Sequence, residues 1–315
     1  MNMATANGAR ASLKAGFETT YGTAATVFGQ YPFYSNDLGG SQELNDDTPL
    51  GYGRNSLAPT LGDFSVEGGI EVPVDVRNFG FWLKAGLGAP TTTDNGDGTY
   101  THEYLSALDN LPSITVEKGF TDIGKYEVHK GVMINTMAFS FERGGSARCT
   151  INSIAKDESN NPSTIEASPN TKKFDRFNGF NGSVTSAGVA IGSVTSAEFT
   201  INNGLEAIRT IRNDRSIDGV DVGQFMVEGG ITVRYENNIL MDKAIAGEAI
   251  DLIFEYKRND DEYVKFTMHK VHLPKPKTSI EGPGGIEATF NFKAAYDEVE
   301  GKMMTVELKN DVDTY

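Results

Sequence analysis

Cysteine, tryptophan and histidine are all scarce: the 315 residues include one, one and four of them respectively. The single cysteine, Cys149, excludes an intramolecular disulfide framework and a four-cysteine zinc site, and it predicts a reducing compartment such as a bacterial cytosol. No apolar run reaches the length of a membrane span, and residues 1–12 lack the apolar core of a signal peptide. We therefore expect no membrane span and no secretion signal.

Basic residues are also few, with 28 Lys and Arg against 43 Asp and Glu and a net charge of −15. Binding of nucleic acid by counterion release and docking on an anionic membrane both need a basic surface, so the balance disfavours both. Glycine, by contrast, is abundant at 35 residues. It follows no triplet period, which excludes collagen, so the surplus indicates turns, bulges and loops.

Signatures of catalysis and of metal binding are missing. The sequence has neither a Gly-x-Ser-x-Gly elbow nor a Gly-Lys-Ser/Thr phosphate loop, and His102 lacks a second histidine four residues later. His269 and His272 would point to opposite faces of a strand, and Cys149 falls at a core position of another. Residues 94–98 (Asp-Asn-Gly-Asp-Gly) indicate a hairpin turn rather than a calcium loop. We expect no enzyme activity and no cofactor.

Period-two alternation dominates the chain and predicts a mainly β protein. It is clearest over 64–72 and over 133–154, where we expect a long hairpin closed at Gly144-Gly145. Asn78 and the pair Asn237-Asn238 stand where they could cap two short helices, over 76–87 and 237–246. Segments 35–60 and 157–190 indicate long loops. Further strands are expected over 27–34, 112–118, 193–202, 225–236, 249–257, 262–273, 285–296 and 303–309.

An internal repeat is the strongest signal. Residues 64–72 (FSVEGGIEV) reappear at 225–233 (FMVEGGITV), identical at seven of nine positions and offset by 161 residues. The offset also matches Gly62 with Gly223 and brings the two expected helices into register. A repeat this long is no solenoid unit and predicts a duplicated β-rich domain.

From this repeat we expect a first domain over 1–156, which contains an N-terminal arm over 1–12 and the long loop 35–60. We expect a connecting loop region over 157–190 and a second domain over 191–315. The Gly pair inside each repeated strand predicts a bend or a close backbone approach; a shared turn between two short strands is the alternative. The repeated residues are candidates for a sheet that joins subunits: Phe64, Val66, Glu67, Gly68, Gly69, Ile70, Phe225, Val227, Glu228, Gly229, Gly230 and Ile231.

Three stretches together resemble the tail tube (major tail) proteins of bacteriophages with long non-contractile tails. They are residues 17–23 (FETTYGT), the strands at 66–72 and 227–233, and residues 111–117 (LPSITVE). The resemblance implies a β-sandwich or barrel-like domain with a short helix that contributes to a closed inner β-barrel on assembly, and the internal repeat predicts two such domains in this chain. Rings of such domains stack into a hollow tube through which the genome passes.

Duplication changes the expected number of chains in a ring. Three chains with two tube domains each supply the six domains of a six-fold ring. Six chains per ring, with the second copy decorating the outside, is the alternative. Glu67 and Glu228 are candidates for the acidic lumen, past which DNA slides without specific binding; a solvated sheet face explains these two residues equally well. The resemblance further implies a tape-measure protein, a tail assembly chaperone, and terminator and distal tail proteins as partners, in a virion tail made in the host cytoplasm.

Two other functions remain open at this point. A phage fibre or adhesin would also be acidic and rich in glycine, but it should expose an aromatic cluster or a carbohydrate groove. A β-rich hydrolase of unrecognised type would need a pocket of converging titratable groups.

Overall fold

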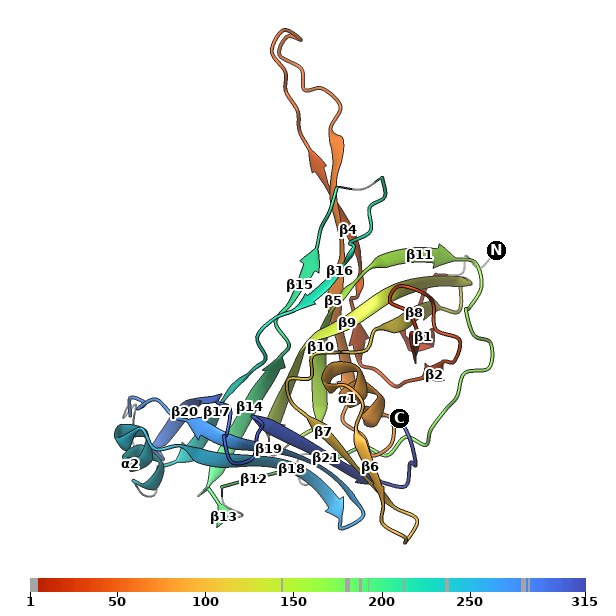
Figure 1. Ribbon diagram of the computed structural model, residues 1–315. Helices are drawn as coiled ribbons and strands as arrows, with labels where there is room; N and C mark the ends of the chain where they lie inside the picture. Colours follow the sequence, from red (N-terminus) through yellow and green to blue (C-terminus); the bar gives the residue numbers. More distant parts are fainter. Residues whose placement is uncertain are drawn as a thin grey trace.

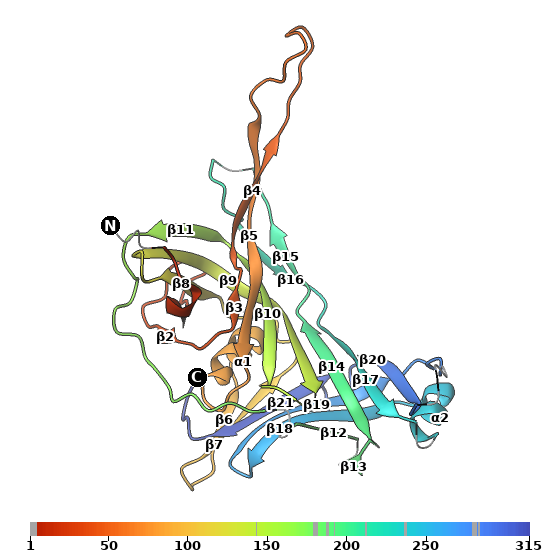
Figure 2. The same cartoon turned by 180° about the vertical axis from the view of Figure 1, so that it is seen from behind.

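Alternating apolar and polar residues form long antiparallel strands that stack in two layers (Figures 1 and 2). The computed structural model describes residues 5–142, 144–178, 182–186, 189–191, 193–211, 213–235, 238–278, 282 and 284–315. Strands make up 52% of the structure and helices 7%. The predicted mainly β, sandwich-like class is confirmed, and within the described residues the sheet stays open rather than closing into a barrel.

The first layer runs across both halves of the sequence. In spatial order, it consists of β3 (Ser35–Asn36) and β4 (Gly39–Asn45), β5 (Thr60–Pro73), β10 (Arg148–Ala155), β9 (Lys125–Glu142), β14 (Val194–Asn202), β17 (Met226–Arg234) and β20 (Glu287–Ala294). β9 is the junction, because its C-terminal half pairs with β10 on one side and with β14 on the other. One face of this layer is buried and the other carries polar side chains.

The second layer covers the buried face. Its order is β13 (Val189–Ala190), β12 (Gly182–Ser186), β18 (Ile250–Asn259), β19 (Glu262–His272), β21 (Met304–Asn310), β7 (Tyr100–Leu105) and β6 (Thr91–Asp94). Between the layers, the Phe139 ring lies 4.8 Å from that of Phe199 and 4.7 Å from that of Phe266. One hydrophobic cluster therefore spans both predicted domain ranges, and the division at 157–190 stays a prediction.

A smaller sheet lies beside the first half. It contains β2 (Gly29–Gln30), β1 (Ala11–Phe17), β8 (Ile114–Phe120), the N-terminal half of β9 and β11 (Asp157–Asn161), and a 3-10 turn η1 (Gly8–Arg10) precedes β1. The buried Glu117 carboxylate accepts hydrogen bonds from Lys14 (3.0 Å), Thr164 (2.8 Å) and the Ile165 amide (2.5 Å). The prediction that 157–190 is a loop is therefore wrong for β11, β12 and β13, and the start of this segment is anchored to the smaller sheet.

Each repeated strand is followed by a helix, as expected: α1 (Phe79–Leu87) follows β5 and α2 (Ile239–Ala246) follows β17. The predicted capping by asparagine is wrong for both described residues, because neither Asn78 nor Asn238 makes a side-chain capping bond; Asn237 lies outside the described residues. At α1 the buried Asp75 carboxylate accepts the Asn78 amide instead, at 3.1 Å. A carboxylate suits the positive end of the helix dipole.

Two hairpins project from the layers in the same direction (Figure 1). The longer one extends β4 and β5, and the shorter one is formed by β15 (Leu205–Ile208) and β16 (Gly219–Val222). The prediction that 35–60 is a loop is wrong for β3 and β4, whose polar residues lack alternation and pair as edge strands along the backbone of β5. The strand predicted over 27–34 is also wrong beyond the two residues of β2. The other predicted strands and the turn at 94–98 are confirmed.

The strands beside β5 and β17 pair with them in matching registers. On one side, Gly39 opposes Glu67, and 161 residues later Thr200 opposes Glu228. On the other side, β10 pairs with β5 and β20 pairs with β17, and equivalent partner residues on β10 and β20 are 139 residues apart. The second glycine of each motif faces an asparagine there. The pairs on that side are Gly69 with Asn152, Ile70 with Ile151, Gly230 with Asn291, and Ile231 with Phe290.

Asp75 should make stability depend on pH. Burial raises the pKa of its carboxyl to about 6 from its usual value of 3.8, so the folded state holds this proton more tightly than the unfolded chain does. The stabilisation is therefore full below about pH 4 and is lost between about pH 4 and 6. Relative to the Asp75→Asn variant, the wild type should lose on the order of 2 kcal/mol of unfolding free energy between pH 4 and 7 in urea titrations. Parallel pH curves for the two proteins would contradict this.

Candidate functional site

The repeated motif lies at the centre of the first layer. Val66 and Ile70 of β5 point into the core, as do Val227 and Ile231 of β17, and each is at most 2% exposed. The aromatic members of the predicted set are Phe64, which is half-buried, and Phe225, which is buried and lies just before β17. The structure therefore places all the motif residues except Phe225 on two strands of one sheet, separated by β10, β9 and β14.

The first glycine of each pair is required by a close approach of the neighbouring strand. A Cβ at Gly68 would lie 2.6 Å from the Leu38 Cα, and Gly68 has φ +153°. A Cβ at Gly229 would lie 2.1 Å from the Glu198 carbonyl oxygen. Both pairs sit inside continuous strands, so the close-approach prediction is confirmed and the shared-turn alternative is wrong.

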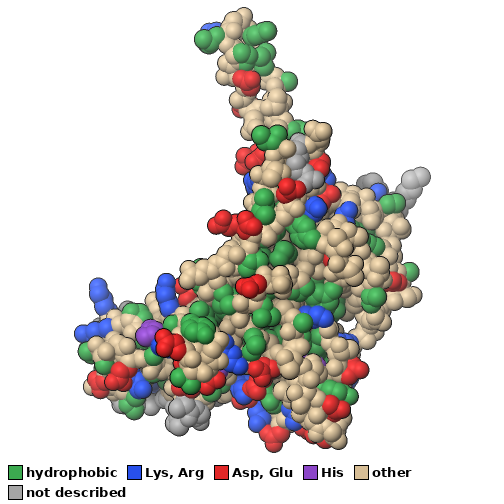
Figure 3. Space-filling model, viewed as in Figure 1, with side chains coloured by type: hydrophobic (Ala, Val, Ile, Leu, Met, Phe, Trp, Pro, Cys, Tyr) green, Lys and Arg blue, Asp and Glu red, His purple; other side chains and the backbone are tan. Residues whose placement is uncertain are grey.

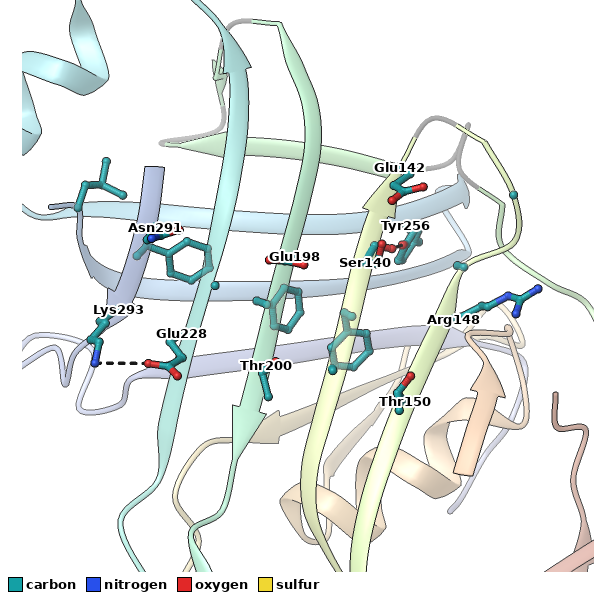
Figure 4. A pocket seen from close by; sticks show the side chains of 18 of the residues that line it. Ser140, Glu142, Arg148, Thr150, Glu198, Thr200, Glu228, Tyr256, Asn291 and Lys293 are labelled. Carbon is teal, nitrogen blue, oxygen red and sulfur yellow. Dashed lines mark hydrogen bonds and ion pairs between the residues drawn. The ribbon is translucent and has the colours of Figure 1, made fainter. Parts of the chain in front are cut away.

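The glutamates of the motif lie on the opposite, polar face. The Glu67 and Glu228 side chains are 55% and 56% exposed. Around Glu228 this face is hollowed by a cavity of about 1290 Å³ that extends over β10, β9, β14 and β20 (Figure 4). Its charged lining residues are Glu71, Glu142, Arg148, Glu198, Glu228 and Lys293.

Acidic side chains outnumber basic ones in this hollow. Lys293 Nζ lies 3.4 Å from a Glu228 oxygen, and Arg148 lies 2.9 Å from Glu71. No described cation forms an ion pair with Glu142 or Glu198. Hydroxyl and amide groups of Ser140, Thr150, Thr200 and Asn291 line the space between the charges (Figure 4). The face is hydrophilic and net negative, and its charged groups are spread along strands.

The sequence reasoning missed most of this face. Glu142, Glu198 and Glu71 alternate with buried residues of β9, β14 and β5, as Glu67 does with Val66. The same period-two rule that singled out Glu67 and Glu228 could have found them. What the sequence could not supply is the order of the strands, which brings these side chains to one surface.

The residues considered for chemistry do not converge. Burial raises the pKa of the Cys149 thiol, which is inaccessible in β10. The buried His102 ring contacts the Thr92 hydroxyl at 2.8 Å and the Val312 carbonyl at 2.9 Å. His269 contacts the Thr305 hydroxyl at 2.8 Å. Among the described residues, no three metal-ligating side chains gather into a site.

Exposed apolar side chains gather on the longer hairpin, whose tip carries a cluster of them in Figure 3. Leu50 is 98% exposed and Leu61 71% exposed, and Ile211 at the tip of the shorter hairpin is fully exposed. The longer hairpin also exposes Leu44, Tyr52 and Leu57. Apolar residues concentrated on a projecting arm are typical of an interaction surface.

A family model described as phage tail tube protein matches residues 8–294. The chain belongs to the phage tail tube protein family. The resemblance drawn from the sequence is thereby confirmed, over nearly the whole chain. No curated protein matches the sequence.

Family membership defines the class of this tail tube protein as a structural component of the phage tail rather than a member of an enzyme family. Separately, neither described helix is both long enough and apolar enough to cross a membrane. The main surface features of this tail tube protein are the polar face, the edge strands of the first layer and the two projecting hairpins.

Adjacent glycines of β17 provide a matched test of the close approach. Gly229→Ala should destabilise this tail tube protein by about 1–3 kcal/mol, because its Cβ would overlap the backbone of β14. Gly230→Ala should change the unfolding free energy by less than about 1 kcal/mol, since its Cβ would meet nothing closer than the Asn291 side chain, at 3.4 Å. Urea unfolding of the two variants measures the difference, and equal losses would contradict the account.

Proposed function

We propose that this tail tube protein assembles into rings that stack into a hollow tube for genome passage, with the polar face of the first layer as the lumen. The observation that carries the proposal is the seven-stranded layer itself, counting β3 and β4 as one edge. It has one apolar face packed on a second layer, one acidic face, and two edges, β3–β4 and residues 287–292 of β20, that have no further strand partner among the described residues. Closing such a sheet around an axis removes its free edges.

We further propose three chains per ring. Each chain supplies two modules, the predicted domains 1–156 and 191–315, that arose by duplication. The matching registers around β5 and β17 support the duplication. The rival arrangement, six chains with the second module outside, requires the two modules to face different environments. The β9–β14 pairing argues against it, because it continues the polar face of the first module directly into the second.

An acidic lumen suits passage of DNA. The proposed lumen carries Glu67 and Glu228 at equivalent positions, and Glu142 and Glu198 at the junction between the modules. Carboxylates repel phosphates, so DNA is excluded from close contact with the wall and slides, whereas a basic lumen would hold it by counterion release.

The two projecting hairpins would join successive rings. Both leave the layer in one direction (Figure 1), and the longer one exposes leucines that are costly to leave in water. Burying them on the next ring would favour stacking. A fibre or adhesin would instead use exposed aromatic residues to bind a receptor, and the apolar residues on the hairpin are mainly aliphatic.

The remaining partners follow from the resemblance. We expect a tape-measure protein inside the tube, an assembly chaperone before assembly, and terminator and distal tail proteins at the two ends. Synthesis in the host cytoplasm fits the single buried cysteine.

Electron microscopy of concentrated protein tests the proposal. We expect tubes of uniform width whose averaged cross-sections repeat three times around the axis, with a weaker six-fold component from the two modules. Six identical repeats per turn would contradict three chains per ring. Particles that never form rings or tubes at any concentration would contradict the tube itself.

Stacking should depend on the apolar tip of the longer hairpin. Replacing Leu50 and Tyr52 with serine should leave the melting temperature of the single subunit within about 2 °C, because both side chains are exposed, at 98% and 69%. Tubes should become at least several-fold shorter at equal protein concentration. The matched control is Val299→Ser, which removes an apolar side chain that is 92% exposed away from both hairpins. Equal tube lengths for all three proteins would show that the hairpin tip does not drive stacking.

A further inference from the structure

The two ends of the first layer are open strand edges. β3 and β4 pair with β5 alone, and residues 287–292 of β20 pair with β17 alone, among the described residues. Open edges of this length invite another strand. If the proposed ring forms, the edge of β20 in one subunit faces the edge of β3 and β4 in the next.

The junction inside the chain is a template for this contact. In the first module, β10 is followed outward by the C-terminal half of β9, which then meets β14. In the second module, the pair His272–Lys293 is equivalent to the pair Met133–Ile154 of the first, because both members are offset by 139 residues. The chain is also equally long in the two modules, with fifteen residues from Met133 to Arg148 and from His272 to Glu287. Residues 275–278 therefore correspond to residues 136–139 of β9. In the single subunit, however, residues 273–278 form no strand.

We propose, resting on the proposed function, that residues 275–278 become a strand between β20 and the β3–β4 edge of a second copy of this chain. The register copies that of β9 on β14, in which Ala138 opposes Thr200 and Phe139 opposes Phe199. Lys277 then lies opposite Gly39 of the next subunit, and Thr278 lies opposite Leu38.

Pro274 fits that register. Asn135 is the residue skipped where the pairing of β9 with β10 shifts, and Pro274 is its counterpart. A bulge is one of the few places where a strand accepts proline. Pro276 lacks an amide donor, and in this register its nitrogen faces the second copy, so the pairing lacks one ladder hydrogen bond, to the Gly40 carbonyl. The contact therefore relies on the Pro276 carbonyl and the Thr278 amide, and the segment forms no strand in the single subunit.

Charge favours the same occupant. In the copied register Lys275 and Lys277 point to the polar face, where their diagonal neighbours on the next subunit are Glu43 and Asp37. Both carboxylates are exposed in the single subunit. Opposite charges at diagonal positions of adjacent strands stabilise the pairing and disfavour a shifted register.

The receiving edge already binds surrogate partners. Lys118 donates a hydrogen bond to the Leu38 carbonyl at 2.8 Å, and the Gly40 amide donates to Glu158 at 2.6 Å. These two backbone groups therefore point away from β5, toward the position of an added strand. In the ring, the Pro276 carbonyl replaces Glu158 at the Gly40 amide, and the Thr278 amide replaces Lys118 at the Leu38 carbonyl.

Disulfide trapping tests the register. The Lys277→Cys/Gly39→Cys variant places two cysteines opposite each other across the proposed contact, and the native Cys149 is fully buried. A Cβ at Gly39 meets nothing closer than 3.8 Å, so cysteine fits there. Within one subunit the two positions lie at opposite ends of the first layer, roughly 25 Å or more apart at about 4.8 Å per strand, so only cross-links between subunits form. Oxidised tubes should give a ladder in non-reducing denaturing gels that ends at three chains.

The control is Lys277→Cys/Glu43→Cys, which keeps the same face but shifts the partner by four residues, about 13 Å along the strand. It should remain monomeric on the gel. Equal cross-linking of both variants, or tubes of the first variant without any ladder, would overturn the register while leaving tube assembly intact. If the double variant does not assemble, tubes co-assembled from the two single variants should give covalent dimers, and their absence would overturn the register equally. Wild-type protein that forms no rings or tubes would overturn the proposed function instead.

Discussion

The antiparallel pairing of β9 with β14 is the constraint on which the rest of the structure depends. It joins strands from the two halves of the chain into one layer, and its register sets which residues of both halves share a face. Because side chains alternate with a period of two, a slip of β14 by one residue would turn Phe199 away from Phe139 and bury Glu198. The stacking of those two rings on the second layer opposes such a slip. The acidic face is thus a direct consequence of a hydrophobic core that holds the register.

Sequence alone predicted the strands that alternate and missed the ones that do not. β17, β18 and β19 were found within a few residues because buried and exposed side chains alternate along them. β4 was missed, since its Gly, Ser and Asn residues have no period and its position is fixed by hydrogen bonds to β5. The sequence suggested Asn78 as the cap of α1, whereas the Asp75 carboxylate accepts the free Asn78 amide. The position of Asp75 depends on how the chain leaves β5, which the local sequence does not show. The repeated Glu-Gly-Gly step located the central strands, but the order of strands between them is a long-range property that no local pattern contains.

The two modules differ where the proposed ring needs them to differ. The first has a complete outer strand, the C-terminal half of β9, which finds its partner β14 within the chain. The second has residues 273–278 in that place, with two prolines and two lysines, which natural sheets use to keep an open edge from pairing indiscriminately. A subunit that carried a second copy of β9 there would expose a finished apolar edge before assembly. The difference between the halves thus reconciles a stable single subunit with the continuation of the sheet into its neighbour in the proposed ring.

In the proposed tube both modules line the same wall, so Glu67 and Glu228 should be equally accessible from the lumen. Each can be replaced by cysteine in turn and treated with a maleimide attached to a folded protein too wide for the bore, with a small maleimide as control. In single subunits both cysteines should react with both reagents, because both side chains are more than half exposed. In assembled tubes both should react with the small reagent only. A tube in which the cysteine at position 67 is protected while that at position 228 still reacts with the bulky reagent would place the second module outside and contradict the account.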